Sequence, residues 1–290
     1  MALRKRALSA LNRLPPFSPI LSKLMASLAG QDISFAVLGD LIEKDTVIAG
    51  NVLRVVNSAA YARRDTISSV RHSLSVLGLE KLRNMVLGMS VSRMLNQAQT
   101  PKEWPMERFN KHSAAVAILS DLLVQRLKIE YPEGAFIGGL MHDVGKLVIA
   151  IGLPSEFQSV VAMYRTGVPW TECELRTLGF THAELSGDIL EAWKLPQEIC
   201  TAVGCHHSEI QPPATGTPWP LASAIWAADE YVNGMGESLF PPRVPPHAAA
   251  AGYDTAPLLE FCESAGLKGD LGKLIEAFNT EYSTVAEFYR

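Results

Sequence analysis

Apolar residues recur at spacings of three and four along most of the chain, and few segments alternate as β-strands do. In the first third, such stripes occupy SPILSKLMASLAG, SFAVLGDLIEKD and DTVIAGNVLRVVNSAAY. Gly30 is expected to end the first of these helices, and Asp45 is placed as the N-cap of the third. The pattern predicts an all-α protein.

A polar segment with two prolines, NQAQTPKEWPM, interrupts this helical pattern. Before it, SSVRHSLSVLGLEKLRNMVLGMSVSRML predicts two helices that break at Gly78, and after it a second helical block begins. We therefore expect an N-terminal helical part over 1–104, packed on a second helical domain over 105–290. Two closing helices, split near Gly266 to Gly269, are predicted at the C-terminal end and should pack on the second domain.

Composition and charge limit which class of protein this can be and where it is expected to act. The 290 residues are 48% hydrophobic and 19% charged, which allows a large buried core. The net charge of −4 offers no basic surplus for phosphate backbones, so nucleic acid is not an expected partner. The N-terminus lacks a signal-peptide pattern, no apolar run is long enough to span a membrane, and the four cysteines form no C-x-x-C motif. These features predict a cytoplasmic protein without a membrane partner.

Three polar residues fall on stripes that should face the core. His112 occupies a stripe position in MERFNKHSAAVAILSDLLVQRL, and Asp229 follows Ile225 by four residues in PLASAIWAADEYV. In FTHAELSGDILEAW a capping box starts a helix whose inward face is headed by His182. A buried polar group without a partner is costly, so each of these residues requires one.

Two adjacent pairs complete the set of candidate residues. His142 and Asp143 lie in FIGGLMHDVGK, and His206 and His207 lie in TAVGCHHSE, each where an apolar helix is expected to end. Two consecutive side chains at a helix end can converge on one point. Lys146 follows one turn later, within reach of an anion held there.

Five histidines and two aspartates are therefore candidates for one site. A single histidine on an apolar stripe is more often a hydrogen-bonded core residue than a ligand, and we assign His72 and His247 to that ordinary class. For seven such groups together, metal ions are the simplest common partner. Imidazoles with a bridging carboxylate suit two transition-metal ions, with iron or manganese preferred over calcium.

The spacing of His112, HDVGK, THAELSG, HH and AAD resembles the HD superfamily of metal-dependent phosphohydrolases, which includes the HD-GYP phosphodiesterases. From about Leu14 to Asn233 the chain is similar to the HDOD domain, a bacterial signalling module related to the HD fold. VLRVVNSAAY and SLSVLGLEKLRNMVL carry the N-terminal part of this likeness. The resemblance implies that one metal is held by His112, His142, Asp143 and Asp229, and a second by Asp143, His182, His206 and His207.

The resemblance leaves two functions open. The first is a signal-transduction protein that acts through contacts with signalling proteins or by sensing a nucleotide or phosphate ligand. The second is a phosphohydrolase or phosphodiesterase acting on a nucleotide, in which Asp143 and Lys146 would be catalytic and Lys146 would contact the substrate phosphate. Ser208 and Glu209 follow the histidine pair where the phosphodiesterases have glutamate directly, and PPATGTPWP contains no GYP. These departures favour the regulatory function.

Overall fold

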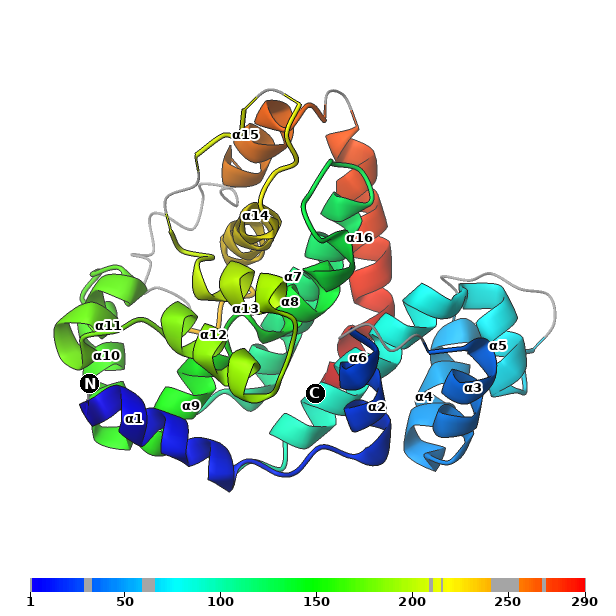
Figure 1. Cartoon of the computed structure of the whole chain (residues 1–290), viewed down its shortest axis with the longest axis horizontal. Helices are drawn as coiled ribbons and strands as arrows, with labels where there is room; N and C mark the ends of the chain where they lie inside the picture. Colours follow the sequence, from blue (N-terminus) through cyan, green and yellow to red (C-terminus); the bar gives the residue numbers. More distant parts are fainter. Residues whose placement is uncertain are drawn as a thin grey trace.

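The computed structural model describes residues 2–28, 33–58, 66–208, 211–214, 216–240, 256–267 and 270–289 (Figure 1). Within these ranges the chain forms α-helices and short 3-10 turns, and an isolated β-bridge joins Ile129 to Trp219. The predicted all-α fold is confirmed. The expectations for Gly30, Glu209, His247 and Gly269 lie outside the described residues.

The helices before residue 100 include one long and largely buried helix, α6. They are α1 (Ala2–Ser9), η1 (Ala10–Arg13), α2 (Pro19–Leu28), α3 (Phe35–Glu43), α4 (Thr46–Val56), α5 (Val70–Leu77) and α6 (Leu79–Leu95). The Asp45 carboxylate accepts a hydrogen bond from the Ile48 amide at 3.1 Å, so the predicted N-cap of α4 is confirmed. Gly78 separates α5 from α6 with a φ of 81°, a left-handed value that glycine adopts without strain. Helices α2 to α5 all contact α6, which also packs on α8.

The remaining helices begin with the long helix α7. These are α7 (Met106–Val124), η3 (Pro132–Gly134), α8 (Ala135–Met141), α9 (Val144–Gly152), α10 (Pro154–Tyr164), α11 (Trp170–Leu178), α12 (His182–Ala192), α13 (Gln197–Gly204), α14 (Leu221–Gly234), α15 (Ala256–Ser264), α16 (Leu271–Val285) and η4 (Ala286–Tyr289). Helix α7 packs against α8, α14 and α16. A Cβ on Gly139 would lie 2.8 Å from the Ala117 Cα, so α8 crosses α7 at a distance that a larger residue would prevent.

Helix α1 lies apart from α3 to α5 and packs on α9 and α12 (Figure 1). The Arg4 guanidinium makes two hydrogen bonds to the Asp188 carboxylate of α12, at 2.6 and 2.8 Å. The first helix of the chain thus touches two helices of the second block. The division into 1–104 and 105–290 stays a prediction.

The C-terminal helices close the structure on the side of α7 and α14. Helix α15 packs on α14 and α16 packs on α7, while η4 contacts α6 and α7. The Tyr289 ring is buried against α6, where a Cβ on Gly88 would lie 2.1 Å from the tyrosine oxygen. The last described turn, η4, therefore packs on the long N-terminal helix α6.

The stretch Pro132–Gly152 is apolar and long enough to cross a membrane by length and composition alone. In this fold it comprises η3, α8 and α9, and nearly all of its most apolar window is buried among other helices. Core packing therefore accounts for its apolar character.

Candidate metal centre

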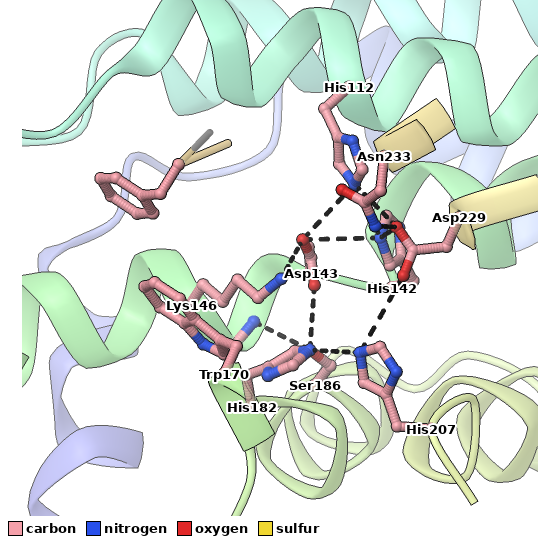
Figure 2. Close-up of polar contacts among 12 residues, drawn as sticks. His112, His142, Asp143, Lys146, Trp170, His182, Ser186, His207, Asp229 and Asn233 are labelled. Atoms are coloured by element: carbon pink, nitrogen blue, oxygen red, sulfur yellow. Dashed lines mark hydrogen bonds and ion pairs between the residues drawn. The ribbon is translucent and has the colours of Figure 1, made fainter. Parts of the chain in front are cut away.

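Seven histidine and aspartate side chains meet inside the second block of helices, and Figure 2 labels all of them except His206. Each comes from the end or the inward face of a helix that packs near α7 or α12. All are at most 1% exposed except one histidine, whose side chain is 23% exposed. The structure thus brings together every residue predicted for the site. They are His112 of α7, His142 and Asp143 between α8 and α9, His182 of α12, His206 and the partly exposed His207 after α13, and Asp229 of α14.

One half of the cluster gathers around Asp229. The His112 Nε2 lies 3.1 Å from the Asp229 Oδ1 and 3.2 Å from the His142 Nε2. The same Asp229 oxygen is 3.5 Å from the His142 Nε2, and the Asp143 Oδ2 is 3.5 Å from that nitrogen and 3.6 Å from the His112 Nε2. Two imidazoles and two carboxylates therefore present donor atoms to one small volume.

The other half gathers around His182. Its Nε2 lies 3.1 Å from the Asp143 Oδ1 and 3.1 Å from the His207 Nε2. The His206 ring packs between the two halves, with centroids 5.1 Å from His142 and 5.4 Å from His182. Asp143 therefore directs one oxygen toward each half of the cluster.

Four of the imidazoles are held with Nε2 facing the centre. The Nδ1 atoms of His142 and His206 lie 2.7 Å from backbone oxygens in their own helices, and the His112 Nδ1 lies 3.0 Å from the Glu237 oxygen. The His182 Nδ1 lies 2.7 Å from a carboxylate oxygen of Glu174. An oxygen acceptor at Nδ1 places the proton there and leaves the Nε2 lone pair free, as in histidines that ligate metals.

Three buried atoms in the cluster lack a hydrogen-bond partner among the described residues. They are the Asp143 Oδ1, the Asp229 Oδ2 and the His206 Nε2. The 3.1 Å approach of the His182 Nε2 to the Asp143 oxygen does not have hydrogen-bond geometry. A buried acceptor without a hydrogen-bond partner is costly, and so is the close approach of two Nε2 lone pairs, as between His112 and His142. Cations bound in the cluster would satisfy all of these atoms. The donor set therefore fits metal ions, and its imidazole and carboxylate chemistry suits transition metals.

Electrostatics keeps most of these groups ready to ligate. Burial alone would raise the pKa of Asp143, but Lys146 and the neighbouring imidazoles outweigh it and hold that pKa well below its ordinary value. Burial lowers the pKa of His206 well below its usual range and that of His207 to about 3, so both stay neutral. Burial also opposes charge on His182, but the Glu174 and Asp143 carboxylates together outweigh it and raise that pKa.

The cluster opens onto a cavity of about 340 Å³. His207 and Asp229 form part of its wall, together with Lys146, Trp170 and Asn233. The Lys146 Nζ donates a hydrogen bond to the Asp143 Oδ2 at 2.7 Å and lies 5.5 Å from the centroid of the Trp170 ring (Figure 2). A ligand in this cavity would therefore contact the Lys146 ammonium and, at the same time, the two cluster residues His207 and Asp229.

Sequence reasoning missed Glu174, the buried partner of His182. Trp170, Glu174 and Leu178 follow one another at intervals of four in α11, on a face where Glu174 and Leu178 are buried. The same stripe argument that selected His112 would have selected this glutamate. The predicted capping box was right, since the Thr181 and Glu184 side chains each bond the other's backbone amide. His72 is not part of the cluster, as expected, but it lies exposed on α5 and not in the core.

The profile of the HDOD domain matches residues 14–209. The chain belongs to the HDOD family. The match spans α2 to α13 and the histidine pair, so all the candidate ligands except Asp229 lie within the HDOD domain. The predicted family is confirmed.

Solved structures of similar fold cover nearly all of this HDOD protein. An HDOD domain protein of unknown function from Geobacter sulfurreducens is 22% identical, with a TM-score of 0.75 over 99% of this chain and 97% of the other. A "Putative phosphohydrolase" from Shewanella amazonensis SB2B is 22% identical, with a TM-score of 0.71 over 98% and 97%. A "Putative signal transduction protein" from Marinobacter aquaeolei VT8 is 20% identical, with a TM-score of 0.69 over 99% and 66%. At these identities the likeness establishes the fold.

A curated relative, an uncharacterized protein of Treponema pallidum (strain Nichols), is 20% identical over 235 residues. The alignment covers 79% of this HDOD chain but 44% of the relative. The chain thus spans about half the length of that protein.

Proposed function

We propose that this HDOD protein is a bacterial signal-transduction component that binds two divalent metal ions, iron or manganese, and senses a phosphate-bearing ligand beside them. The observation that carries the proposal is the convergence of all seven predicted ligand residues, with their Nε2 and carboxylate atoms facing inward. The sensed state would pass to signalling proteins by direct contact. We expect this to happen in the cytoplasm, without nucleic acid or a membrane.

Two ions would share Asp143. Its Oδ2 faces one group and its Oδ1 faces the other, so its carboxylate would be the ligand common to both ions. The three unpartnered buried atoms, the Asp143 Oδ1, the Asp229 Oδ2 and the His206 Nε2, would then each have a cation to bind. One ion would be held by His112, His142, Asp143 and Asp229, and the other by Asp143, His182, His206 and His207.

A phosphate group suits the cavity because the Lys146 ammonium lines it and the proposed metal ions would add positive charge at its inner end. The Lys146 ammonium reaches into the cavity wall, and burial beside Asp143 does not neutralise it: its pKa is raised, since the neighbouring carboxylates outweigh the effect of burial. Asn233 and His207 add polar atoms to the same wall. Phosphate or a nucleotide phosphate would therefore meet metal charge and an ammonium at once.

Phosphate-ester hydrolysis is the second candidate, and one observation favours it. The cavity reaches the cluster through His207 and Asp229, so a bound ester would have direct access to the metals. Two divalent ions would supply the positive charge and Lewis acidity that hydrolysis of a phosphate ester requires. Lys146 would stabilise negative charge on the phosphate oxygens, and Asp143 would keep the two halves of the site in register.

Binding and turnover assays distinguish the two candidates. The protein is loaded with manganese or iron(II), binding of inorganic phosphate is measured by equilibrium dialysis, and hydrolysis of p-nitrophenyl phosphate and bis(p-nitrophenyl) phosphate is followed. Binding without hydrolysis supports the sensor, and hydrolysis that is lost in Asp143→Ala but kept in His72→Ala supports the enzyme. A loaded protein that neither binds phosphate nor cleaves either ester would refute both.

A further inference from the structure

The carboxylate of Glu174 joins the metal cluster to the wall of the cavity. One of its oxygens, Oε2, lies 2.7 Å from the His182 Nδ1 and accepts a hydrogen bond from the His182 amide at 2.9 Å. The other, Oε1, accepts the indole N–H of Trp170 at 2.7 Å. Glu174 is 1% exposed, so these three contacts take place away from water.

Trp170 is the part of this chain of contacts that a ligand would touch. Its ring lines the cavity, lies 5.5 Å from the Lys146 Nζ and stacks on Phe240 with ring planes 4° apart. Because the indole and His182 share one carboxylate, a displacement of Trp170 must either reorient Glu174 or leave the buried Glu174 Oε1 without its hydrogen bond. A buried acceptor that loses its hydrogen bond costs free energy, so reorientation of Glu174 is favoured.

We propose that Glu174 is a positioning residue that couples occupancy of the cavity to the metal affinity of His182. The inference rests on the proposed function, because it requires metal at the cluster. Glu174 holds the His182 proton on Nδ1 and leaves Nε2 as the ligand atom. Trp170 fixes the orientation of Glu174 through the second oxygen. Coupling between two sites is reciprocal, so metal at His182 also strengthens ligand contact at Trp170.

A double-mutant cycle tests the coupling. Cobalt(II) affinity is measured by absorption and chelator competition in the wild type, Glu174→Gln, Trp170→Phe and the double variant. Glutamine can turn its NH₂ toward Nδ1 and place the imidazole proton on Nε2, so Glu174→Gln should weaken binding by about 10- to 100-fold and alter the cobalt spectrum. Trp170→Phe keeps an aromatic ring but loses the N–H, so it should weaken cobalt binding when Glu174 is intact.

Non-additivity is the decisive outcome. In the Glu174→Gln background, Trp170→Phe should change the affinity by less than about twofold, because the contact through which it acts has already been altered. Trp104→Phe is the matched control, since Trp104 is buried beside Phe240 and its indole nitrogen has no hydrogen-bond partner among the described residues. It should leave cobalt affinity unchanged.

A second readout uses inorganic phosphate as the cavity probe. Phosphate should change the cobalt affinity of the wild type and lose that effect in Trp170→Phe. Equal effects of Trp170→Phe in both backgrounds, or an effect no larger than that of Trp104→Phe, would overturn the coupling while leaving the metal site intact. A wild type that binds no cobalt would instead defeat the proposed function on which the coupling rests.

Discussion

Substitution of Gly145 by alanine perturbs the packing that holds the two halves of the cluster together. Gly145 lies in the first turn of α9, and its amide donates a hydrogen bond to the Ser186 Oγ of α12 at 2.8 Å. An added Cβ would lie 2.2 Å from the His182 backbone oxygen and 2.9 Å from the Ser186 Oγ. Cβ atoms essentially never approach other atoms within 3.0 Å, so the helices must separate by roughly 0.8 Å, the difference between 3.0 and 2.2 Å.

That displacement acts directly on the site. Asp143 precedes α9 and His182 begins α12, and their ligand atoms are 3.1 Å apart. Metal–ligand distances tolerate only about 0.2 Å, so Gly145→Ala should lower metal affinity sharply. Overpacking of a core contact should also cost about 1–3 kcal/mol of unfolding free energy. Thermal unfolding with and without chelator, together with metal analysis, measures both effects.

Gly50→Ala is the matched control for this prediction. Gly50 is exposed in the middle of α4, and a Cβ there would have no neighbour within 4 Å. Alanine should stabilise this position by about 0.5–1 kcal/mol and leave the metal content unchanged. If Gly145→Ala melts like the wild type and retains its metal, the close contact between α9 and α12 does not set the geometry of the site.

Three further predictions concern the helix cap, pH and partners. Thr181→Ala removes the acceptor of the Glu184 amide and should cost about 1 kcal/mol in denaturant unfolding, whereas an unchanged midpoint would show that the cap does not stabilise α12. Carboxylates outweigh burial and raise the pKa of His142 and His182, so protons compete with metal at these residues at higher pH than at a free imidazole. Metal affinity should therefore fall as pH falls, with proton release measurable by calorimetry in buffers of different ionisation enthalpy; pH-independent affinity between pH 6 and 8 would contradict this. The net charge of −4 predicts no salt-sensitive DNA or RNA binding in a filter assay at micromolar protein, and such binding would overturn that expectation.

The sequence sufficed for the fold class and for the residues that form the cluster. His112 and Asp229 could be found because a polar residue on an apolar stripe breaks a regular pattern. His142 and His206 could be found because each stands in a pair at the end of an apolar helix. Local periodicity carries this information, since it fixes which face of a helix turns inward.

Contacts between distant helices could not be obtained in this way. Periodicity does not place α1 beside α9 and α12, and it does not reveal that Gly145 lies against the His182 backbone. Glu174 was overlooked because its role depends on which imidazole faces it, although its own position on a helical stripe was visible. Pairing between helices depends on three-dimensional packing, which the local periodicity of one sequence does not reveal.

The metal content of the purified protein tests the central claim most directly. Wild type, Asp143→Ala and His72→Ala are prepared without chelators, supplied with iron or manganese, and analysed by elemental mass spectrometry. Asp143 directs one oxygen to each half of the cluster, whereas His72 is exposed on α5. We predict two metal ions per chain in the wild type and His72→Ala, and an empty site in Asp143→Ala. A metal-free wild type would contradict the account, and His142 and Asp143 would then be a buried hydrogen-bonded pair in a purely regulatory fold.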